Sequence, residues 1–324
     1  MKPIHPSLSR LVAVLALGLC VTASHADTYP SATISLVVPF AAGSGTDAVA
    51  RTVAQKLSER LKQTVVVENK AGASAQIAAQ FVAAAKPDGY TLFMTTNTSH
   101  SANPSLFKTL KYDPIKDFTP IARVGELPFA LAVHPAVPAK TLKELMDYAK
   151  ANPGKLSYAT PNSTSLVTTE TIKRMAGIDM VAIPYKSSPQ AMTDLIGGQV
   201  QVYVTDFGSG MSMIKSDKIR TLAVTTATPS KIFPHLPTVG QTVPGFDLTS
   251  WNGIFGPAGL PRPIVERINN ELQVILADKE VQDKLSQLGF EVWPSKTPDE
   301  FAKYVSDQLV NWTTLIRQAG IKPE

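Results

Sequence analysis

Val37-Val38-Pro39-Phe40-Ala41-Ala42-Gly43-Ser44-Gly45-Thr46-Asp47 is the stretch on which the fold assignment depends. The apolar run 34–38 is typical of a buried strand, and a small, flexible loop follows it. A helix is predicted after the loop, because apolar residues recur at every fourth position on one face: Val49, Val53, Leu57 and Leu61. The stretch therefore reads as a strand, a glycine-containing loop and a helix in succession.

The loop has the features of an anion site. Ser44 or Thr46 can cap the helix, and Asp47 falls in the first turn, where a carboxylate suits the helix dipole. Gly43 and Gly45 let the backbone approach a ligand, and the first N–H groups of the helix are unpaired. The pattern lacks the third glycine of a dinucleotide fingerprint and the Gly-Lys-Ser/Thr of a P-loop. An ordinary tight turn remains the alternative reading.

Residues 1–26 are predicted to be a secretory signal. Lys2 and Arg10 precede or flank an apolar stretch, 11–21, and Ser24-His25-Ala26 offers small residues for cleavage after Ala26. The apolar stretch is too short to favour a membrane anchor. Cleavage at Cys20 as a lipoprotein is disfavoured because Leu19 precedes it. We therefore expect an exported protein.

The composition of the mature chain excludes several classes of function. Cleavage would remove the one cysteine, so neither a disulfide nor thiol chemistry is expected. Loss of Lys2 and Arg10 leaves 29 basic residues (31 − 2) against 26 acidic ones, a net charge of +3. That surplus forms no basic cluster and does not indicate nucleic-acid binding. No metal-ligand spacing, Gly-x-Ser-x-Gly or His-Glu-x-x-His is present, so we expect no metal, no cofactor and no enzyme.

Strands and helices alternate along most of the chain, which predicts an α/β fold with parallel sheets. The tail after about residue 257 holds helices and little strand, so we expect it to pack back on the first unit. That layout requires two crossings between units, near Gly125 and Thr249, and such a pair forms a hinge. The expected division is a first lobe of 27–124 and 250–324, and a second lobe of 125–249. The expected strands are 64–68, 90–95, 156–160, 181–185, 200–205, 221–225 and 248–256, and the expected helices are 74–86, 142–149, 164–175, 188–196, 211–214, 261–277, 279–288 and 297–318.

A polar stretch follows the third predicted strand, at the sheet edge where ligands bind in this architecture. It runs from Thr96 to Asn103 and includes Asn97, Ser99 and His100, whose side chains suit hydrogen bonding to a ligand. A solvated loop with capping residues is an equally simple reading.

The motifs taken together resemble the periplasmic solute-binding proteins of tripartite tricarboxylate transporters, also called the Bordetella uptake gene family. The resemblance covers essentially the whole mature chain. It rests on the order and spacing of segments that are individually weak: 29–30, 38–47 with 50–51, 67–70 with 72, 87–92, 103–106, 112–114 with 116–118, 184–186, 194–198, 251–253 and 257–259.

The resemblance implies a two-lobed, Venus-flytrap fold of the type II-like kind, with the ligand in the cleft. In the family a carboxylate docks on the first-lobe loop through backbone groups and bridging waters, which here involves Phe40, Ala42, Gly43, Ser44, Gly45, Thr46 and Asp47. The opposing loop, 159–165, lacks the glycines usual in the family. Its hydroxyls, on Thr160, Ser163, Thr164 and Ser165, can still donate to a carboxylate. Asp206 stands where the family often has a cleft acid, and Lys186 borders the cleft; a helix cap and an exposed lysine are the plain alternatives.

The function implied is that of a monomeric periplasmic receptor that captures a small carboxylate and delivers it to membrane permease subunits. Because the loops are rich in neutral donors and poor in arginine, we expect a mono- or dicarboxylate, aliphatic or aromatic, rather than a tricarboxylate. A sensory receptor that presents its ligand to a signalling kinase is the first alternative. An extracytoplasmic hydrolase is the second, and the sequence offers it little support.

Overall fold

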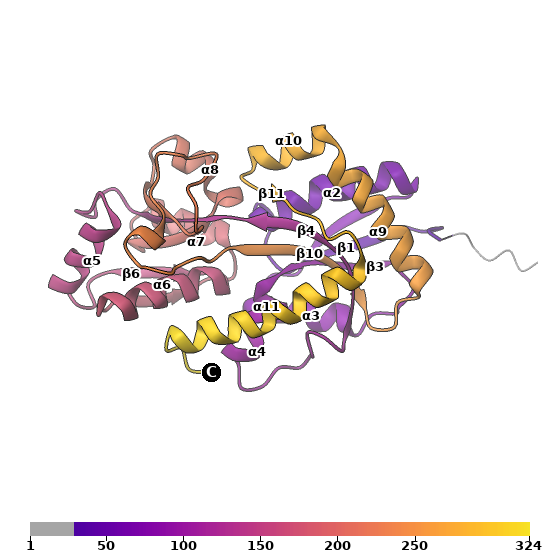
Figure 1. Cartoon of the computed structure of the whole chain (residues 1–324), viewed down its shortest axis with the longest axis horizontal. Helices are drawn as coiled ribbons and strands as arrows, with labels where there is room; N and C mark the ends of the chain where they lie inside the picture. Colours follow the sequence, from indigo (N-terminus) through magenta and orange to yellow (C-terminus); the bar gives the residue numbers. More distant parts are fainter. Residues whose placement is uncertain (1–28) are drawn as a thin grey trace, which may run out of the picture.

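The computed structural model describes residues 29–324, which fold around two β-sheets arranged side by side (Figure 1). The predicted signal peptide, 1–26, lies outside the described residues. Two strands, β4 (Phe118–Leu127) and β10 (Ser250–Pro257), run together along the middle of the molecule and lead from one half to the other. Among the helices of residues 29–324, none combines the length and the hydropathy needed to cross a membrane.

The first lobe is built on a six-stranded sheet in the order β11-β4-β10-β3-β1-β2. Strand β1 is parallel to β2 and β3, whereas β10 is antiparallel to β3 and β4. The parallel part is the βαβ arrangement that the alternation of the sequence predicts. The remaining strands of this sheet are β1 (Ile34–Val38), β2 (Val65–Asn69), β3 (Thr91–Thr96) and β11 (Glu291–Val292).

The second lobe is built on a five-stranded sheet in the order β7-β6-β8-β5-β9. Its central strand β8 is parallel to β6 and antiparallel to β5. Only Pro128 separates the end of β4 in the first sheet from the start of β5 in the second. The strands of this sheet are β5 (Phe129–Val133), β6 (Ser157–Thr160), β7 (Val181–Pro184), β8 (Val202–Asp206) and β9 (Arg220–Val224).

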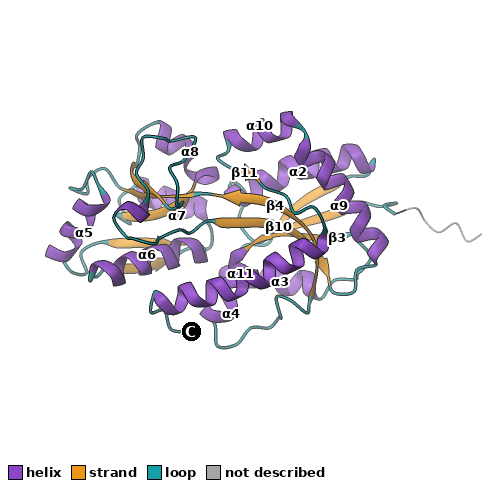
Figure 2. Ribbon diagram, in the orientation of Figure 1, coloured by secondary structure: helices purple, strands orange, loops and turns teal. Residues whose placement is uncertain are grey.

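Helices cover both sheets (Figure 2). Those that follow the first sheet's strands, or form the C-terminal part, are α2 (Gly45–Leu61), α3 (Gln76–Ala83), α4 (Asn103–Leu106), α9 (Arg262–Ala277), α10 (Lys279–Gln287) and α11 (Pro298–Gln318). Those of the second lobe are α5 (Leu142–Ala151), α6 (Ser163–Ala176), α7 (Ser188–Ile196) and α8 (Phe207–Lys215). Short turns occur at η1 (Ala73–Ala75), η2 (Thr98–Ala102) and η3 (Val239–Gln241).

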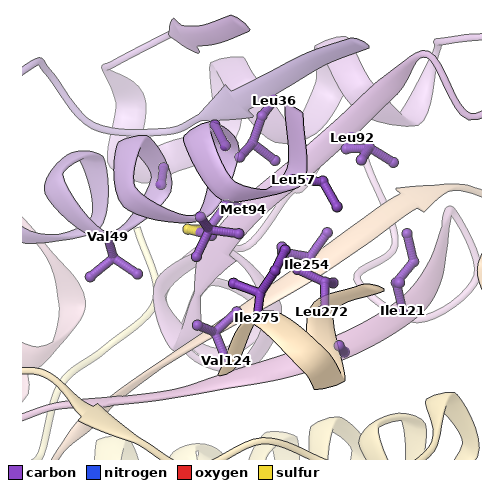
Figure 3. Close-up of a cluster of buried hydrophobic side chains, with 14 of the residues drawn as sticks. Leu36, Val49, Leu57, Leu92, Met94, Ile121, Val124, Ile254, Leu272 and Ile275 are labelled. Atoms are coloured by element: carbon purple, nitrogen blue, oxygen red, sulfur yellow. The ribbon is translucent and has the colours of Figure 1, made fainter. Parts of the chain in front are cut away.

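The apolar face of α2 forms the centre of the first core. Val49 and Leu57 are fully buried and pack with Leu36 of β1, Met94 of β3 and helix α9 (Figure 3). Full burial of one such side chain favours folding by about 1.5–3 kcal/mol. The fourfold spacing that predicted this helix therefore reflects the requirement to cover the sheet, and it fixes the position of the loop before α2.

Helix α11 packs against both lobes rather than only the first. Near its start, Phe301 and Val305 join the aromatic cluster around Trp251 of β10. Near its end, Trp312 and Ile316 join the core of the second lobe. The expectation that the tail returns to the first lobe therefore describes α9, α10 and the first half of α11, but not the second half of α11.

The polar stretch after β3 is not a solvated loop. It forms the π-helical turn η2 and runs on into α4, and its residues from Thr98 to Asn103 are buried. The expected helix 74–86 also begins later, at Gln76, because the backbone from Ala73 to Ala75 turns through left-handed conformations.

Candidate functional site

The loop between β1 and α2 is held rigidly by its own side chains. Ser44 caps α2 by accepting a hydrogen bond from Asp47 N–H at 3.2 Å. The Asp47 carboxylate accepts from Gly43 N–H at 2.9 Å and from Asn69 Nδ2 at 2.8 Å. Arg51 Nε donates to the same carboxylate at 3.0 Å. Asp47 therefore fixes the conformation of the loop.

The electrostatics of Asp47 agree with that structural role. Burial alone would raise the pKa of this carboxyl group. Hydrogen bonds from Arg51, Asn69 and the Gly43 N–H outweigh burial and lower the pKa below its usual value. The ionised side chain thus keeps the loop in the conformation that presents the start of α2 to the cleft.

A small cavity of about 20 Å³ lies between the lobes at the end of this loop. That volume holds about one water molecule, so the two lobes are closed on each other. The first lobe contributes Phe40, Ser44, Gly45, Thr46, Thr96, Thr98, Leu127 and Ser250 to the lining. The second lobe contributes Phe129, Asn162, Ser188 and Asp206.

Four helices begin at this cavity. Lining residues stand at the N-terminal ends of α2, of α6 (Asn162), of α7 (Ser188) and of α8 (Asp206). Each N-terminus carries partial positive charge and unpaired N–H groups. No lysine, arginine or histidine lines the cavity within residues 29–324. The site can therefore attract an anion through backbone dipoles alone.

Side chains also connect the two lobes beside the cavity. Asn97, which is fully buried, donates through Nδ2 to Ser163 Oγ at 3.0 Å and to Thr164 Oγ1 at 3.1 Å. The Asn97 Oδ1 accepts from Ser250 Oγ at 2.6 Å. On the other side, Ala41 N–H donates to Ser187 Oγ at 3.0 Å. These bonds hold the closed arrangement.

Asp206 is the ionisable side chain among the described residues that line the cavity. It caps α8, because Oδ1 accepts from Ser209 N–H at 2.7 Å. Its Oδ2 accepts from Ser188 Oγ and from Ser209 Oγ, each at 3.0 Å. Burial raises the pKa of this carboxyl group, and these hydrogen bonds offset that effect only in part. Asp206 therefore both caps α8 and lines the cleft.

The predicted site residues fall into three groups. Five line the cavity: Phe40, Ser44, Gly45, Thr46 and Asp206. Three take part in the cross-lobe hydrogen bonds: Asn97, Ser163 and Thr164. The others lie outside the lining. Ala42 and Gly43, on the loop, and Lys186 are exposed, whereas Ser99 and His100 are buried. Asp47 faces the loop, Thr160 donates a hydrogen bond to Ile183 O, and Ser165 donates one to Val204 O.

His100 is enclosed by aromatic rings rather than directed to the cavity. Its ring stacks on Phe255 at 4.1 Å between centroids and lies 4.6 Å from Phe118. The Nδ1 atom shares a hydrogen bond with Ser99 Oγ at 2.9 Å, and Nε2 has no partner among the described residues. Burial lowers the pKa of His100 to about 3, so the ring is uncharged.

Sequence reasoning missed several lining residues, and only some carried a usable signal. Asn162 and Ser188 stand at helix starts after predicted strands, so capping patterns could have identified them. Leu127 and Ser250 lie where the chain crosses between lobes, and nothing local in the sequence marks them as cleft residues.

A larger cavity, of about 610 Å³, lies elsewhere, among β4, β11, α11 and the segments 226–230 and 247–249. Its lining includes the carboxylates of Glu126, Asp247 and Glu291 together with Trp293 and Tyr304. Three acidic groups without a lining cation disfavour an anion. No group of three or more residues suited to a metal ion occurs within residues 29–324. The cleft cavity is therefore the candidate site.

Comparison with known proteins agrees with this geometry. The sequence pattern of the tripartite tricarboxylate transporter family receptor matches residues 49–321. A UPF0065 protein of Bordetella bronchiseptica is 38% identical over 315 residues, covering 97% of this chain and 93% of the relative. The BugT protein of Bordetella pertussis is 31% identical over 325 residues, covering 98% and 99% of the two chains.

Solved structures are similar over nearly the whole described chain. A protein of R. palustris with adipate superimposes with a TM-score of 0.89 at 34% identity, covering 91% of this chain and 100% of its own. The periplasmic binding protein BugD gives 0.87 at 35% identity, with coverages of 91% and 100%. MatC of Rhodopseudomonas palustris with bound malate gives 0.84 at 30% identity, with coverages of 89% and 100%. The expected two-lobed periplasmic-binding-protein fold is confirmed, and the chain belongs to the tripartite tricarboxylate transporter receptor family, whose members are periplasmic solute-binding receptors.

Proposed function

We propose that this protein captures a small mono- or dicarboxylate, aliphatic or aromatic, between its lobes and delivers it to the membrane permease subunits of a tripartite transporter. The observation that carries the proposal is the convergence of four helix N-termini on a cleft cavity without a cationic side chain. The similar structures with adipate and with malate support a carboxylate as the ligand class.

Ligand entry requires the lobes to open. A cavity of about 20 Å³ is far too small for a C4 to C6 acid. We propose a hinge at the two crossings, with 27–124 and 250–324 as one lobe and 125–249 as the other. Sheet membership supports this division, although β4 reaches Leu127 in the first sheet. The bound acid would replace part of the direct contact between the lobes.

We propose that the first-lobe contacts come from Phe40, Ser44, Gly45 and Thr46, through backbone N–H groups and hydroxyls. The second lobe would contribute Asn162, Ser188 and Asp206, with Asn97, Ser163 and Thr164 beside them. Bridging waters between ligand and loop cost little affinity. The receptor would act as a monomer after cleavage behind Ala26, and no chemical change of the ligand is part of this function.

A thermal-shift screen of residues 27–324 tests the ligand class. The panel holds C4 to C8 dicarboxylates, aromatic acids, acidic amino acids, nicotinate and citrate. A ligand that binds only the folded state increases the free energy of unfolding, by about 2.7 kcal/mol when its concentration is 100 times Kd. The melting temperature therefore rises. Mass spectrometry of the denatured protein controls for an acid carried over from expression. If no acid binds the protein after such a ligand has been removed, the proposal is wrong.

Delivery to a permease is tested separately from binding. Small-angle scattering is expected to show a more open particle without ligand in solution, and a compact one with a saturating acid. Transport by membranes that carry the permease subunits should then require the liganded receptor. If the liganded form instead activates a sensor kinase and supports no transport, the sensory alternative is correct.

A further inference from the structure

Asp206 places a negative charge at the point where the cleft would receive a second one. Its carboxylate is 3% exposed and lies against the start of α2. A Cβ atom added to Gly45 would stand 2.3 Å from Asp206 Oδ1. Gly45 is also the first residue of α2, where the N–H groups available to an anion begin. Any carboxylate that docks on these groups therefore comes close to Asp206.

Among residues 29–324, no lysine, arginine or histidine lines the cavity to balance two carboxylates at this position. On α2 the charged residues nearest in sequence to Gly45 are Asp47 and Arg51, and these pair with each other at 3.0 Å. On β4 and β5 the facing residues are Leu127 and Phe129, which are apolar. Within residues 29–324, α2, β4 and β5 therefore contribute a helix dipole and apolar side chains beside Asp206, but no free positive charge.

The other second-lobe elements around Asp206 likewise contribute no free positive charge within the described residues. The titratable group of β8 that faces Asp206 is the phenol of Tyr203, whose pKa is raised by burial and by the neighbouring carboxylate. On α7, Asp194 lies toward the other end of the helix and bonds Tyr185 at 2.8 Å. On α8, Lys215 is the last residue of the helix, and no charged residue follows Asp206 in the first turn.

Two carboxylates that share a closed, buried site each raise the pKa of the other, so one of the two favours its protonated form. Asp206 is suited to hold a proton. Its hydrogen-bond partners include the hydroxyls of Ser188 and Ser209, at 3.0 Å, and a hydroxyl group can either donate or accept. Burial has already raised the pKa of Asp206, so the protonation requires less free energy than at an exposed aspartate.

We infer that the receptor binds its carboxylate together with one proton, which is held between Asp206 and the bound acid. This inference rests on the proposed function and concerns the same cleft. It makes Asp206 the residue that links ligand capture to pH. Binding then strengthens as the pH falls, by up to tenfold for each pH unit over which the free protein keeps Asp206 ionised.

Calorimetric titration with adipate and with malate tests the inference. Each titration is run at pH 6, 7 and 8, in two buffers that differ in ionisation enthalpy, so that the buffer dependence of the heat gives the number of protons taken up. For the wild type we expect a maximum approaching one proton per bound acid, and an affinity that falls toward pH 8. Asp206→Asn should take up no proton, bind with an affinity independent of pH, and bind more tightly than the wild type at pH 8.

Asp278→Asn is the matched control. Asp278 caps α10 by accepting from Glu280 N–H at 2.8 Å, on the exterior and away from the cleft. An asparagine can cap a helix nearly as well as an aspartate at either position, so both variants are expected to fold. The control should keep the proton uptake of the wild type.

The possible results separate the inference from the proposed function. Binding without proton uptake would mean that the acid offers its own donor to Asp206, such as the hydroxyl of malate, and would overturn the inference alone. Proton uptake that persists in Asp206→Asn would also overturn it. If neither these acids nor any other of the panel binds at any pH, the proposed function itself is contradicted, and the inference fails with it.

Discussion

Gly45 and Gly208 meet across the cleft, one from the start of α2 and the other from the first turn of α8. A Cβ atom on Gly208 would lie 2.5 Å from the Cα of Gly45, which is closer than real Cβ atoms approach a neighbour. The two lobes therefore touch backbone to backbone at this point. The absence of side chains here sets how far the cleft can close.

Gly208→Ala is expected to stop the lobes short of full closure. The helical φ and ψ of Gly208 suit alanine, and the clash with Gly45 arises only when the lobes are closed, so the melting temperature of the open form without ligand should change little. The affinity for a bound acid should fall by about tenfold or more, a cost of about 1.4 kcal/mol. Calorimetry measures the affinity, and small-angle scattering of the liganded form should show a larger particle. Gly197→Ala is the control, since its nearest neighbour would be Thr193 O at 3.4 Å. An unchanged affinity for Gly208→Ala would mean that the bound state is not closed to this extent.

Ser163→Ala is expected to weaken the closed state. The hydroxyl of Ser163 accepts from Asn97 Nδ2 and bonds Thr98 Oγ1, each at 3.0 Å across the lobes. Loss of a buried hydrogen-bond partner costs about 1–3 kcal/mol. This cost falls on the closed form and should weaken ligand binding by about 5- to 150-fold.

Ser165→Ala, on the same helix, separates closure from stability. Its hydroxyl donates to Val204 O at 2.7 Å within the second lobe. This variant should lower the melting temperature while leaving the affinity for an acid nearly unchanged. Equal effects of the two substitutions on affinity would contradict a specific role of Ser163 in closure.

Local sequence patterns predicted the elements that cover a sheet. The fourfold apolar spacing of α2 and the Ser44 cap follow from the physics of one helix on one sheet, and the structure has both. The range 188–196 was likewise predicted for α7, where Ser187 and Pro189 mark the start. In these cases the residues that decide the structure are neighbours in sequence.

Features that depend on distant partners could not be predicted in this way. The burial of η2 depends on α11, which lies about two hundred residues later, so the stretch after β3 read as a polar loop. The enclosure of His100 requires Phe118 and Phe255 from two other strands. The pairing of Asn97 with Ser163 exists only when two lobes close, and no periodicity within either segment encodes that event.

The left-handed turn at η1 offers a stabilising substitution. Ala73 has a φ of 46° and is exposed, so its methyl group adds strain without burying surface. The left-handed region costs a non-glycine residue about 1–2 kcal/mol, whereas glycine costs about 0.4–1 kcal/mol through the entropy of the unfolded chain. Ala73→Gly should therefore stabilise the protein by up to about 1 kcal/mol in thermal or urea unfolding. Ala302→Gly, inside α11, should have the opposite sign. A lower stability of Ala73→Gly would mean that the turn is not strained.

Asp47→Asn should destabilise the protein at neutral pH and much less in acid. Because the pKa of Asp47 is lowered in the folded state, its contribution to stability is present above the unfolded pKa. That contribution is lost as the pH falls through the folded pKa, so the difference between wild type and variant should narrow below about pH 4. Melting temperatures from pH 7 to pH 3 measure it. Glu59→Gln, exposed on the same helix, is the control. If the difference in melting temperature between the wild type and Asp47→Asn stays constant down to pH 3, the ionised form of Asp47 does not stabilise the loop.

His100→Phe should make the protein more resistant to acid and leave ligand binding intact. Burial lowers the pKa of His100 to about 3, against 6.5 for an exposed histidine. Between these values the unfolded chain binds a proton that the folded chain does not. Stability therefore declines as the pH falls below about 6.5, by up to about 1.4 kcal/mol per pH unit.

Phenylalanine fits the aromatic surroundings of His100 and removes this proton-linked loss. It leaves the hydroxyl of Ser99 paired with Thr95 Oγ1 at 2.6 Å. Urea unfolding at pH 7, 6, 5 and 4 should show a smaller decline for the variant than for the wild type. His235→Phe, at an exposed histidine, should decline as the wild type does. A loss of acid binding in His100→Phe at pH 7, with the fold intact, would instead favour the sequence expectation that His100 contacts the ligand.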